Sequence, residues 1–272
     1  MKNEYCKDKV QLYKGDCLEI MKDIPDKSID MILCDLPYGT TQNKWDSVIP
    51  FDELWREYKR IIKDNGIIVL FSQQPFTSKL ICSNLKMFRY ELIWEKSKIT
   101  GFLNAKRMPL RSHENILIFY KKLPIYNPQK WQINERFMDR RKKMTIDNHD
   151  YRDRNYGQHI KSSYKDDGTR YPTSVLSFPS ENTEKTNHPT QKPTALLEYL
   201  IKTYTNENMI VLDNCMGSGS TGIACINTNR GFIGIEKDDK YFDLAYNRIN
   251  EYIKNGVRRE RKLFWWEIMK NI

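Results

Sequence analysis

Residues 209–222 read MIVLDNCMGSGSTG, an apolar run followed by a turn that carries Gly217, Gly219 and Gly222. The apolar run has the length of a buried strand, and the glycines satisfy the pattern G-x-G-x-x-G that opens a helix directly after a strand. Such glycines allow a tight turn and let a ligand approach backbone N–H groups. The next apolar run, residues 232–235, ends at Glu236, whose carboxylate can accept hydrogen bonds from two ribose hydroxyls. The stretch predicts a site for an adenosine-containing cofactor and leaves nicotinamide and S-adenosylmethionine cofactors both open.

Strand-sized and helix-sized segments alternate on both sides of this stretch. Helical spacing of apolar residues over 51–62 is followed by Asn65-Gly66, which we interpret as a left-handed helix stop, and by an apolar strand over 67–71. Strand, helix and strand at these lengths form a βαβ unit and predict a mostly parallel sheet in an α/β fold. The remaining predictions are strands over 10–13, 29–34, 89–94 and 115–120, a polar turn-rich segment over 96–104, and helices over 75–85, 196–204 and 241–252.

A second motif, Asp35-Leu36-Pro37-Tyr38-Gly39, directly follows the strand predicted over 29–34. Open α/β sheets bind ligands at the carboxyl ends of their strands. The Asp35 carboxylate and the Leu36 carbonyl can accept both hydrogens of an exocyclic amino group, whose lone pair is otherwise delocalised into the base ring. Pro37 restricts the loop, and Tyr38 offers a flat face on which a base can stack. The motif predicts a pocket for an amino-bearing base.

The region between the two motifs changes in character over residues 121–180. Thirteen Lys and Arg residues stand against seven Asp and Glu residues over 121–170, a net charge of +6, and the whole chain carries +10. Basic residues interleaved with aromatic and amide side chains suit contacts with phosphates and base edges, although a solvated insertion has a similar composition. We predict a catalytic half over residues 1–120, an irregular inserted target-recognition region over 121–180, a cofactor-binding half over 181–255 and a basic, aromatic tail over 256–272 that docks as a helix.

Taken together, these residues resemble the amino-group DNA methyltransferases that use S-adenosylmethionine. The four residues from Asp35 to Tyr38 resemble the family's (Asp/Asn/Ser)-Pro-Pro-(Tyr/Phe/Trp) motif, and the order of base motif, recognition region and cofactor motif resembles its β subgroup. The resemblance covers most of residues 10–250 and implies a Rossmann-like methyltransferase fold with helices on both faces of a twisted sheet. It also implies double-stranded DNA as the partner and S-adenosylmethionine as the cofactor.

The resemblance assigns roles to individual positions. By their place in the family's motifs, the catalytic residues are Asp35, Leu36, Pro37 and Tyr38. Those implied to bind the cofactor are Asp16, Thr190, Lys192, Asp213, Cys215, Gly217, Gly219, Ser220 and Glu236. The segment from His113 into residues 116–120 resembles a strand near the base pocket.

Two positions depart from the family's pattern. Leu36 replaces the usual first proline, which matters little because the backbone carbonyl acts there. Cys215 replaces a common phenylalanine and reduces the apolar cover over the cofactor.

The implied reaction is transfer of a methyl group to a base extruded from the duplex. An aspartate-first motif is mostly associated with adenine in the family, so the resemblance favours N6 of adenine, with N4 of cytosine as the alternative. A nicotinamide-dependent oxidoreductase and a DNA-binding protein without catalysis are further alternatives, and RNA is a more distant substrate. The context favoured by the resemblance is restriction–modification or a related marking of DNA.

Composition limits the remaining possibilities. The apolar runs are strand-sized, and the first residues have no signal-peptide pattern, which favours a cytoplasmic protein without a membrane span. The six cysteines form no Cys-x-x-Cys pair and the four histidines have no metal-ligand spacing, so we expect reduced thiols and no metal. A homodimer is compatible with the sequence.

Overall fold

The computed structural model describes residues 5–7, 9–39, 46–132, 168–180 and 191–270 of the chain. The chain divides into two compact units, one made of Met1–Asn127 with Ser174–Ile272 and one made of Pro128–Thr173. The described part of the second unit contains a short ladder of β7 (Trp131–Gln132) and β8 (Thr169–Arg170). Most of the predicted target-recognition region lies outside the described residues, so its role stays a prediction.

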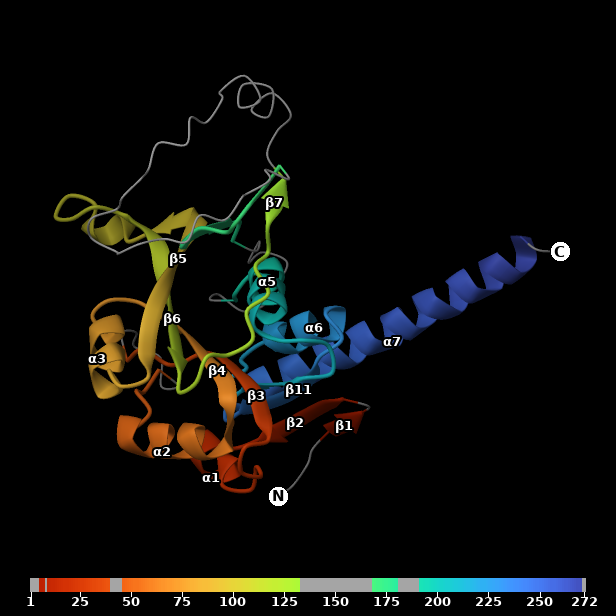
Figure 1. Cartoon of the computed structure of the whole chain (residues 1–272), viewed down its shortest axis with the longest axis horizontal. Helices are drawn as coiled ribbons and strands as arrows, with labels where there is room; N and C mark the ends of the chain where they lie inside the picture. The colour runs from red at the N-terminus through yellow and green to blue at the C-terminus, as the bar shows by residue number, and fades with distance from the viewer. Residues whose placement is uncertain (1–4, 8, 40–45, 133–167, 181–190, 271–272) are drawn as a thin grey trace, which may run out of the picture. The chain divides into compact units, whose positions relative to one another are not determined.

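The first unit is built on a mixed, mostly parallel sheet, as predicted (Figure 1). In spatial order the strands are β1 (Tyr5–Lys7), β2 (Val10–Lys14), β11 (Gly231–Glu236), β10 (Ile210–Asp213), β3 (Ile29–Asp35), β4 (Ile62–Ser72), β6 (Arg111–Tyr120), β5 (Phe88–Thr100) and β9 (Val175–Phe178). The five neighbouring strands from β2 to β4 run parallel to one another. The pairs β1–β2, β4–β6 and β6–β5 are antiparallel, and β9 pairs with β5 in parallel.

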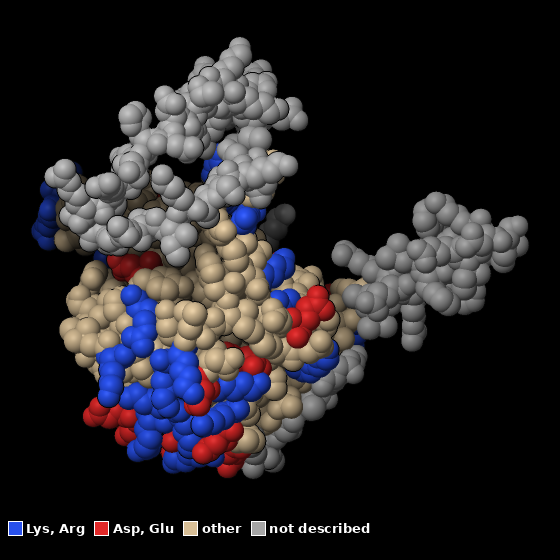
Figure 2. Space-filling view, in the orientation of Figure 1, with Lys and Arg blue, Asp and Glu red and all other residues tan. Residues whose placement is uncertain are grey.

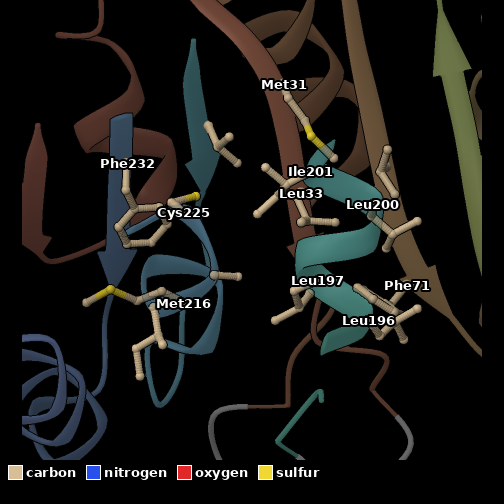
Figure 3. Close-up of a cluster of buried hydrophobic side chains, with 14 of the residues drawn as sticks. Met31, Leu33, Phe71, Leu196, Leu197, Leu200, Ile201, Met216, Cys225 and Phe232 are labelled. Carbon is tan, nitrogen blue, oxygen red and sulfur yellow. The ribbon is translucent and has the colours of Figure 1, made fainter. Parts of the chain in front are cut away.

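Helices cover both faces of this sheet because successive side chains of a strand point to opposite faces. Met31 and Leu33 of β3 belong to the core formed with α5 (Thr194–Tyr204), α6 (Ser220–Asn227) and the first part of α7 (Asp239–Lys270). Ile32 and Cys34 belong to the core formed with α1 (Cys17–Met21), α2 (Phe51–Ile61) and α3 (Phe76–Ser83). Figure 3 shows Leu196, Leu197, Leu200 and Ile201 of α5 beside Met31, Leu33 and Phe71.

The prediction of a left-handed helix stop at Asn65-Gly66 is wrong. Helix α2 ends at Ile61, Ile62 is already extended with φ −72° and ψ 137°, and Gly66 is not among the glycines with positive φ. Gly66 is suited to this position for a different reason, because a Cβ there would lie 2.7 Å from Ile62 Cγ1 and 2.9 Å from the Asp30 carbonyl oxygen. The glycine permits close packing inside β4 and does not reverse the chain.

Strands β5 and β6 are longer than predicted and form a hairpin that extends past the sheet. Residues 96–100, predicted as a polar turn, continue β5 to Thr100, and β6 begins at Arg111. Strand β4 ends at Ser72, which pairs with Asn115, so residues 111–114 of β6 lie beyond the carboxyl end of β4. The hairpin therefore extends beyond the edge at which parallel α/β sheets bind ligands.

The predicted helix over 241–252 is part of a longer helix, α7, which runs from Asp239 to Lys270 and includes most of the predicted tail. Its first part packs on the sheet through Phe242, Ala245 and Ile249, which are all buried. Docking of the tail stays a prediction. Within the described ranges, no helix combines the length and the apolar character needed to cross a membrane.

Candidate active site

Four acidic residues follow one another along the carboxyl edge of the parallel strands. Asp16 follows β2, Glu236 ends β11, Asp213 ends β10 and Asp35 ends β3. The strands are neighbours in this order, with Glu236 paired to Lys14, Asp213 to Gly234 and Leu212 to Ile32. The fold therefore brings the two motifs, far apart in the sequence, to adjacent strand ends.

A cavity of about 920 Å³ opens at this edge. Eleven of the residues predicted for the site line it: Asp16, Asp35, Leu36, Pro37, Tyr38, Lys192, Asp213, Cys215, Gly217, Ser220 and Glu236. Gly219 does not line the cavity; its φ of +77° forms the turn before α6, and a Cβ there would lie 2.9 Å from Ile249 Cδ1. Thr190 lies outside the described residues.

Asp35 is held on both of its carboxylate oxygens. The Tyr38 hydroxyl donates to Oδ1 over 2.6 Å, and Lys192 Nζ donates to Oδ2 over 2.5 Å. Burial raises the pKa of Asp35, and the adjacent Lys192 opposes that rise. The Tyr38 ring lies 5.1 Å from the Phe76 ring, centre to centre, and the Leu36 side chain is buried in the core on the α1–α3 side. These contacts fix the loop that carries the base motif.

Lys192 connects Asp35 to two residues that the site prediction missed, Glu114 and Lys96. Lys192 Nζ lies 3.2 Å from Glu114 Oε2, and Lys96 Nζ lies 3.1 Å from Glu114 Oε1. The first contact is an ion pair without hydrogen-bond geometry, so Oε2 has no hydrogen-bond partner in the part of the chain described. Burial alone would raise the pKa of Glu114, but Lys192 and Lys96 together lower it. The available signal for Glu114 was the resemblance of the segment from His113 into residues 116–120 to a strand near the base pocket.

Burial would lower the pKa of Lys192, but Asp35 and Glu114 together raise it. Its ammonium group also lies 5.1 Å from the centre of the Phe71 ring. The site therefore contains a lysine placed between two carboxylates, and the attraction among the three groups favours the charged form of each.

Glu236 is positioned by the backbone of the loops beside it. Its Oε2 accepts the N–H of Gly217 and its Oε1 accepts the N–H of Asp238, both over 2.9 Å. Burial raises the pKa of Glu236, and these backbone donors partly oppose the rise. Each oxygen retains a further lone pair that can accept a hydrogen bond from a ligand hydroxyl.

The start of α6 contains a polar group that lacks a partner. Ser220 is buried and lines the cavity, and no residue of the described chain forms a hydrogen bond with its hydroxyl. Buried hydroxyls are normally hydrogen-bonded, so this unpaired one is unusual beside the cavity. Cys215 lies at the other end of the loop, where its N–H donates to Asp213 Oδ1 over 3.2 Å.

Asp16 and Lys237 form the end of the cavity away from the base motif. Asp16 Oδ1 accepts the N–H of Leu18 over 3.0 Å at the start of α1, and its Oδ2 lies 3.0 Å from Lys237 Nζ. Partial burial raises the pKa of Asp16, but Lys237 and the backbone donors more than offset this effect. Asp16 is therefore an ionised acceptor beside the cavity.

Asp213 should make the stability of the protein depend on pH. Burial raises its pKa from 3.8 to about 7, although hydrogen bonds from Thr221 and Cys215 oppose the rise. Because the folded state holds this proton more tightly than the unfolded state, the contribution of Asp213 to stability falls as pH rises from about 4 to about 7. The melting temperature of Asp213→Asn minus that of wild type should therefore increase as pH rises from about 4 to about 7, and should stay constant above pH 7.

A matched control is Asp64→Asn. Lys122 and Lys27 lower the pKa of Asp64, so its stabilising contribution appears as pH rises. The melting temperature of Asp64→Asn relative to wild type should therefore fall as pH rises through the acidic range. Parallel melting curves for Asp213→Asn and wild type at every pH would contradict the assignment.

Comparison with known families shows the family of the chain. Residues 29–247 match the N6_N4_Mtase family, described as DNA methylase. The chain belongs to this family. This DNA methylase is 30% identical over 260 residues to the DNA adenine methyltransferase YhdJ of Escherichia coli (strain K12), covering 90% of this chain and 80% of that protein. It is 29% identical to the type II methyltransferase M.HpaI of Haemophilus parainfluenzae, covering 88% of this chain and 74% of that one.

Solved structures agree with the family. The M1.HpyAVI–SAM complex superposes with a TM-score of 0.61 at 28% identity, covering 89% of this chain and 99% of that one. The cytosine-N4-specific PvuII DNA methyltransferase has the same fold, with a TM-score of 0.63 at 14% identity, covering 92% and 93% of the two chains. The DNA methylase has a Rossmann-like methyltransferase fold and uses S-adenosylmethionine. The cavity suits this cofactor, because the glycine turn at Gly217 and the ribose-binding candidate Glu236 both border it.

The family also corrects the range of functions that the sequence left open. A nicotinamide-dependent oxidoreductase explains the glycine motif alone, whereas membership of a DNA methylase family accounts for both motifs. Across the described ranges, no group of three or more His, Cys, Asp or Glu side chains is arranged to hold a metal ion.

Proposed function

We propose that this DNA methylase transfers a methyl group to N6 of adenine at a specific sequence in double-stranded DNA. The observation that carries the proposal is one cavity bordered by the base motif at Asp35 and by the cofactor loop at Asp213 and Gly217. The choice of adenine is supported by the aspartate at the first position of the motif. It is supported further by the 30% identity to a protein named a DNA adenine methyltransferase.

The residues of the base motif would orient the amino group of a base that has left the duplex. An amino group inside a stacked duplex cannot reach the cavity, so enzymes of this kind extrude the base. Asp35 and the Leu36 carbonyl accept its two hydrogens, which turns the nitrogen lone pair toward the cofactor loop. Each Asp35 oxygen already accepts one donor and retains a second lone pair for this purpose. Tyr38 provides the stacking surface.

Bound S-adenosylmethionine supplies the methyl group. Glu236 would accept the ribose hydroxyls, Asp16 would lie on the adenine side, and the glycine turn with Ser220 would lie beside the remaining polar groups. Asp35 acts as an orienting and electrostatic group and needs no high basicity, because the amino proton becomes acidic once the nitrogen carries the methyl group. Lys192 favours the ionised form of Asp35.

One experiment tests the reaction and its target base. The protein is incubated with unmethylated DNA and labelled S-adenosylmethionine, the DNA is digested to nucleosides, and the modified nucleoside is identified by mass spectrometry. We expect N6-methyladenine. N4-methylcytosine would overturn the choice of adenine, and sequencing of the methylated DNA would give the recognition sequence attributed to residues 121–180. The restriction–modification context and a homodimer stay predictions.

Glu236→Gln should weaken S-adenosylmethionine binding by about 10- to 100-fold, the loss expected when charged hydrogen bonds to hydroxyls become neutral ones. The amide oxygen can still accept one of the two backbone N–H groups, but the NH₂ group faces the other, so a melting curve is used to show that the variant is folded. Calorimetric titration measures the dissociation constant. Glu207→Gln is a control, because Glu207 is exposed and accepts a hydrogen bond from Asn229. Equal affinities for Glu236→Gln and wild type would contradict the role of Glu236.

A further inference from the structure

The end of the β5–β6 hairpin exposes several large apolar side chains together. Phe102 is 67% exposed, Leu103 is 102% exposed, and Met108 and Ile99 are 56% and 42% exposed. Single exposed apolar residues are common on protein surfaces, but a group of them at one projecting point indicates an interaction site. These side chains belong neither to the base motif nor to the cofactor loop.

The end of the hairpin is an ordered, hydrogen-bonded turn on which these side chains are exposed. Gly101 has a φ of +97°, and its carbonyl accepts the N–H of Asn104 over 2.9 Å, which forms the short 3₁₀ turn η1 (Phe102–Asn104). The Asn104 carbonyl then accepts the N–H groups of Arg107 and Met108 over 2.8 and 3.0 Å. A turn that is already ordered loses little conformational entropy when it binds a partner.

The charge around the apolar side chains has one sign. Residues 98–111 include Lys98, Lys106, Arg107 and Arg111 and contain no Asp or Glu. None of these four forms a salt bridge with an acid in the described ranges of the chain, unlike the paired charges of α1 and α2. Figure 2 shows blue Lys and Arg atoms at this end of the hairpin, at the upper left, and mixed red and blue atoms at the lower left. Such a surface suits a polyanion.

The base of the same hairpin forms a wall of the active-site cavity. Lys96, Lys98 and Thr100 of β5 line it together with Asp35 and Tyr38. The hairpin end therefore projects beyond the carboxyl end of β4, on the same side as the cavity (Figure 1).

We propose that the hairpin end is a wedge that enters the DNA duplex beside the target base pair. Phe102 and Leu103 would occupy the space between base steps, and the four basic side chains would contact the flanking phosphates. Apolar wedges of Phe and Leu are a general means of unstacking DNA, and unstacking lowers the cost of extruding a base. The inference rests on the proposed function, because it assumes that the target base leaves the duplex.

The test compares Phe102→Ser/Leu103→Ser with the matched variant Leu85→Ser/Leu123→Ser. Leu85 and Leu123 are 63% and 80% exposed and lie beyond the opposite ends of β5 and β6. The readout kcat/KM is measured on a duplex with the recognition sequence found by sequencing. Fluorescence is measured on a second duplex of the same sequence, in which 2-aminopurine replaces the target adenine. The wedge variant should lose about 10- to 100-fold in kcat/KM and most of the fluorescence increase, and the matched variant should lose neither.

A third duplex separates a wedge from a merely structural role. Placing the target base opposite an abasic site removes the pairing that the wedge must break, so it should restore the wedge variant toward wild type. Loss of activity without this rescue, or equal activity of the two variants, overturns the wedge. N4-methylcytosine as the product would overturn the adenine proposal and leave the kcat/KM comparison of the wedge variants intact, with the fluorescent analogue then placed at the target cytosine. A wild type that gives no fluorescence change overturns base extrusion and the wedge together.

The phosphate contacts have their own measurement. Lys106→Gln/Arg107→Gln should reduce the slope of log binding constant against log salt concentration by about 2, or about 1 for each lost phosphate contact. Lys86→Gln, an exposed lysine beyond the opposite end of β5, should change the slope of binding to the same duplex by less. An unchanged slope in the double variant would show that the basic side chains do not contact DNA.

Discussion

Asp35→Asn should reduce methyl transfer to DNA by about 10²- to 10³-fold, the range seen when one preorganised electrostatic partner of a reacting group is removed. The amide retains one acceptor oxygen and places an NH₂ group against either the Tyr38 hydroxyl or the Lys192 ammonium, which are both donors. The substrate amino group then lacks a charged acceptor. Single-turnover transfer of labelled methyl groups to unmethylated DNA measures the loss.

The Asp35→Asn result needs two controls. Binding of S-adenosylmethionine should stay close to wild type, because Asp35 lies at the base end of the cavity, and a cooperative melting transition above the assay temperature would exclude unfolding. Asp64→Asn is the matched variant, since Asp64 pairs with Lys27 and Lys122 on the surface and should leave transfer unaffected. Transfer by Asp35→Asn at the wild-type rate would overturn the catalytic assignment of the motif.

Lys192→Met should destabilise the fold by about 3 to 5 kcal/mol, the usual cost of removing one partner from a buried ion pair. The Lys192 side chain is 10% exposed and lies between the Asp35 and Glu114 carboxylates, so its loss leaves two facing acids without a shared cation. Lys96 continues to pair with Glu114 and limits the damage. Urea unfolding measures the change, and Lys122→Met, at an exposed pair, should change the midpoint little.

The same variant should also move the pH profile. Burial raises the pKa of Asp35 and Lys192 opposes the rise, so removal of Lys192 raises this pKa further. Because transfer requires the ionised carboxylate, the acidic limb of kcat/KM should move to higher pH in Lys192→Met and stay in place in Lys192→Arg. An acidic limb that stays at its wild-type position in Lys192→Met would show that the cation does not act through Asp35.

The sequence pattern predicted the helices and strands correctly where the residues of a single element set its structure. Helical spacing located α2 and α5, and the apolar runs located β3, β10 and β11 to within a residue or two. Pattern failed at Asn65-Gly66, because a glycine that ends a helix and a glycine that lets two strands pack closely look the same in the sequence. It also underestimated β5 and β6, whose polar ends pair with each other and bury little apolar surface.

Some residues of the site could be predicted from the sequence and others could not. Residues inside the two motifs could be named from the sequence, since spacing along one loop is a local property, and eight of the predicted motif residues line one cavity. The resemblance placed the segment with Glu114 near the base pocket, but neither Glu114 nor Lys96 could be given a role, because each is a charged residue on a strand whose neighbour in the sheet was unknown. Their importance depends on Lys192, which reaches them from the segment before α5.

The sequence by itself determined the class of chemistry in this protein: a strand, a glycine turn and a helix for the cofactor, and Asp35 to Tyr38 for the base. Both follow from backbone conformation and side-chain type over a few consecutive residues. Only the tertiary structure decided which charges meet, because the contacts of Lys192 with Asp35 and Glu114 depend on the order of strands in the sheet. It also decided that the β5–β6 hairpin extends past the carboxyl edge beside the cavity, because that position is set by the register of β6 against β4.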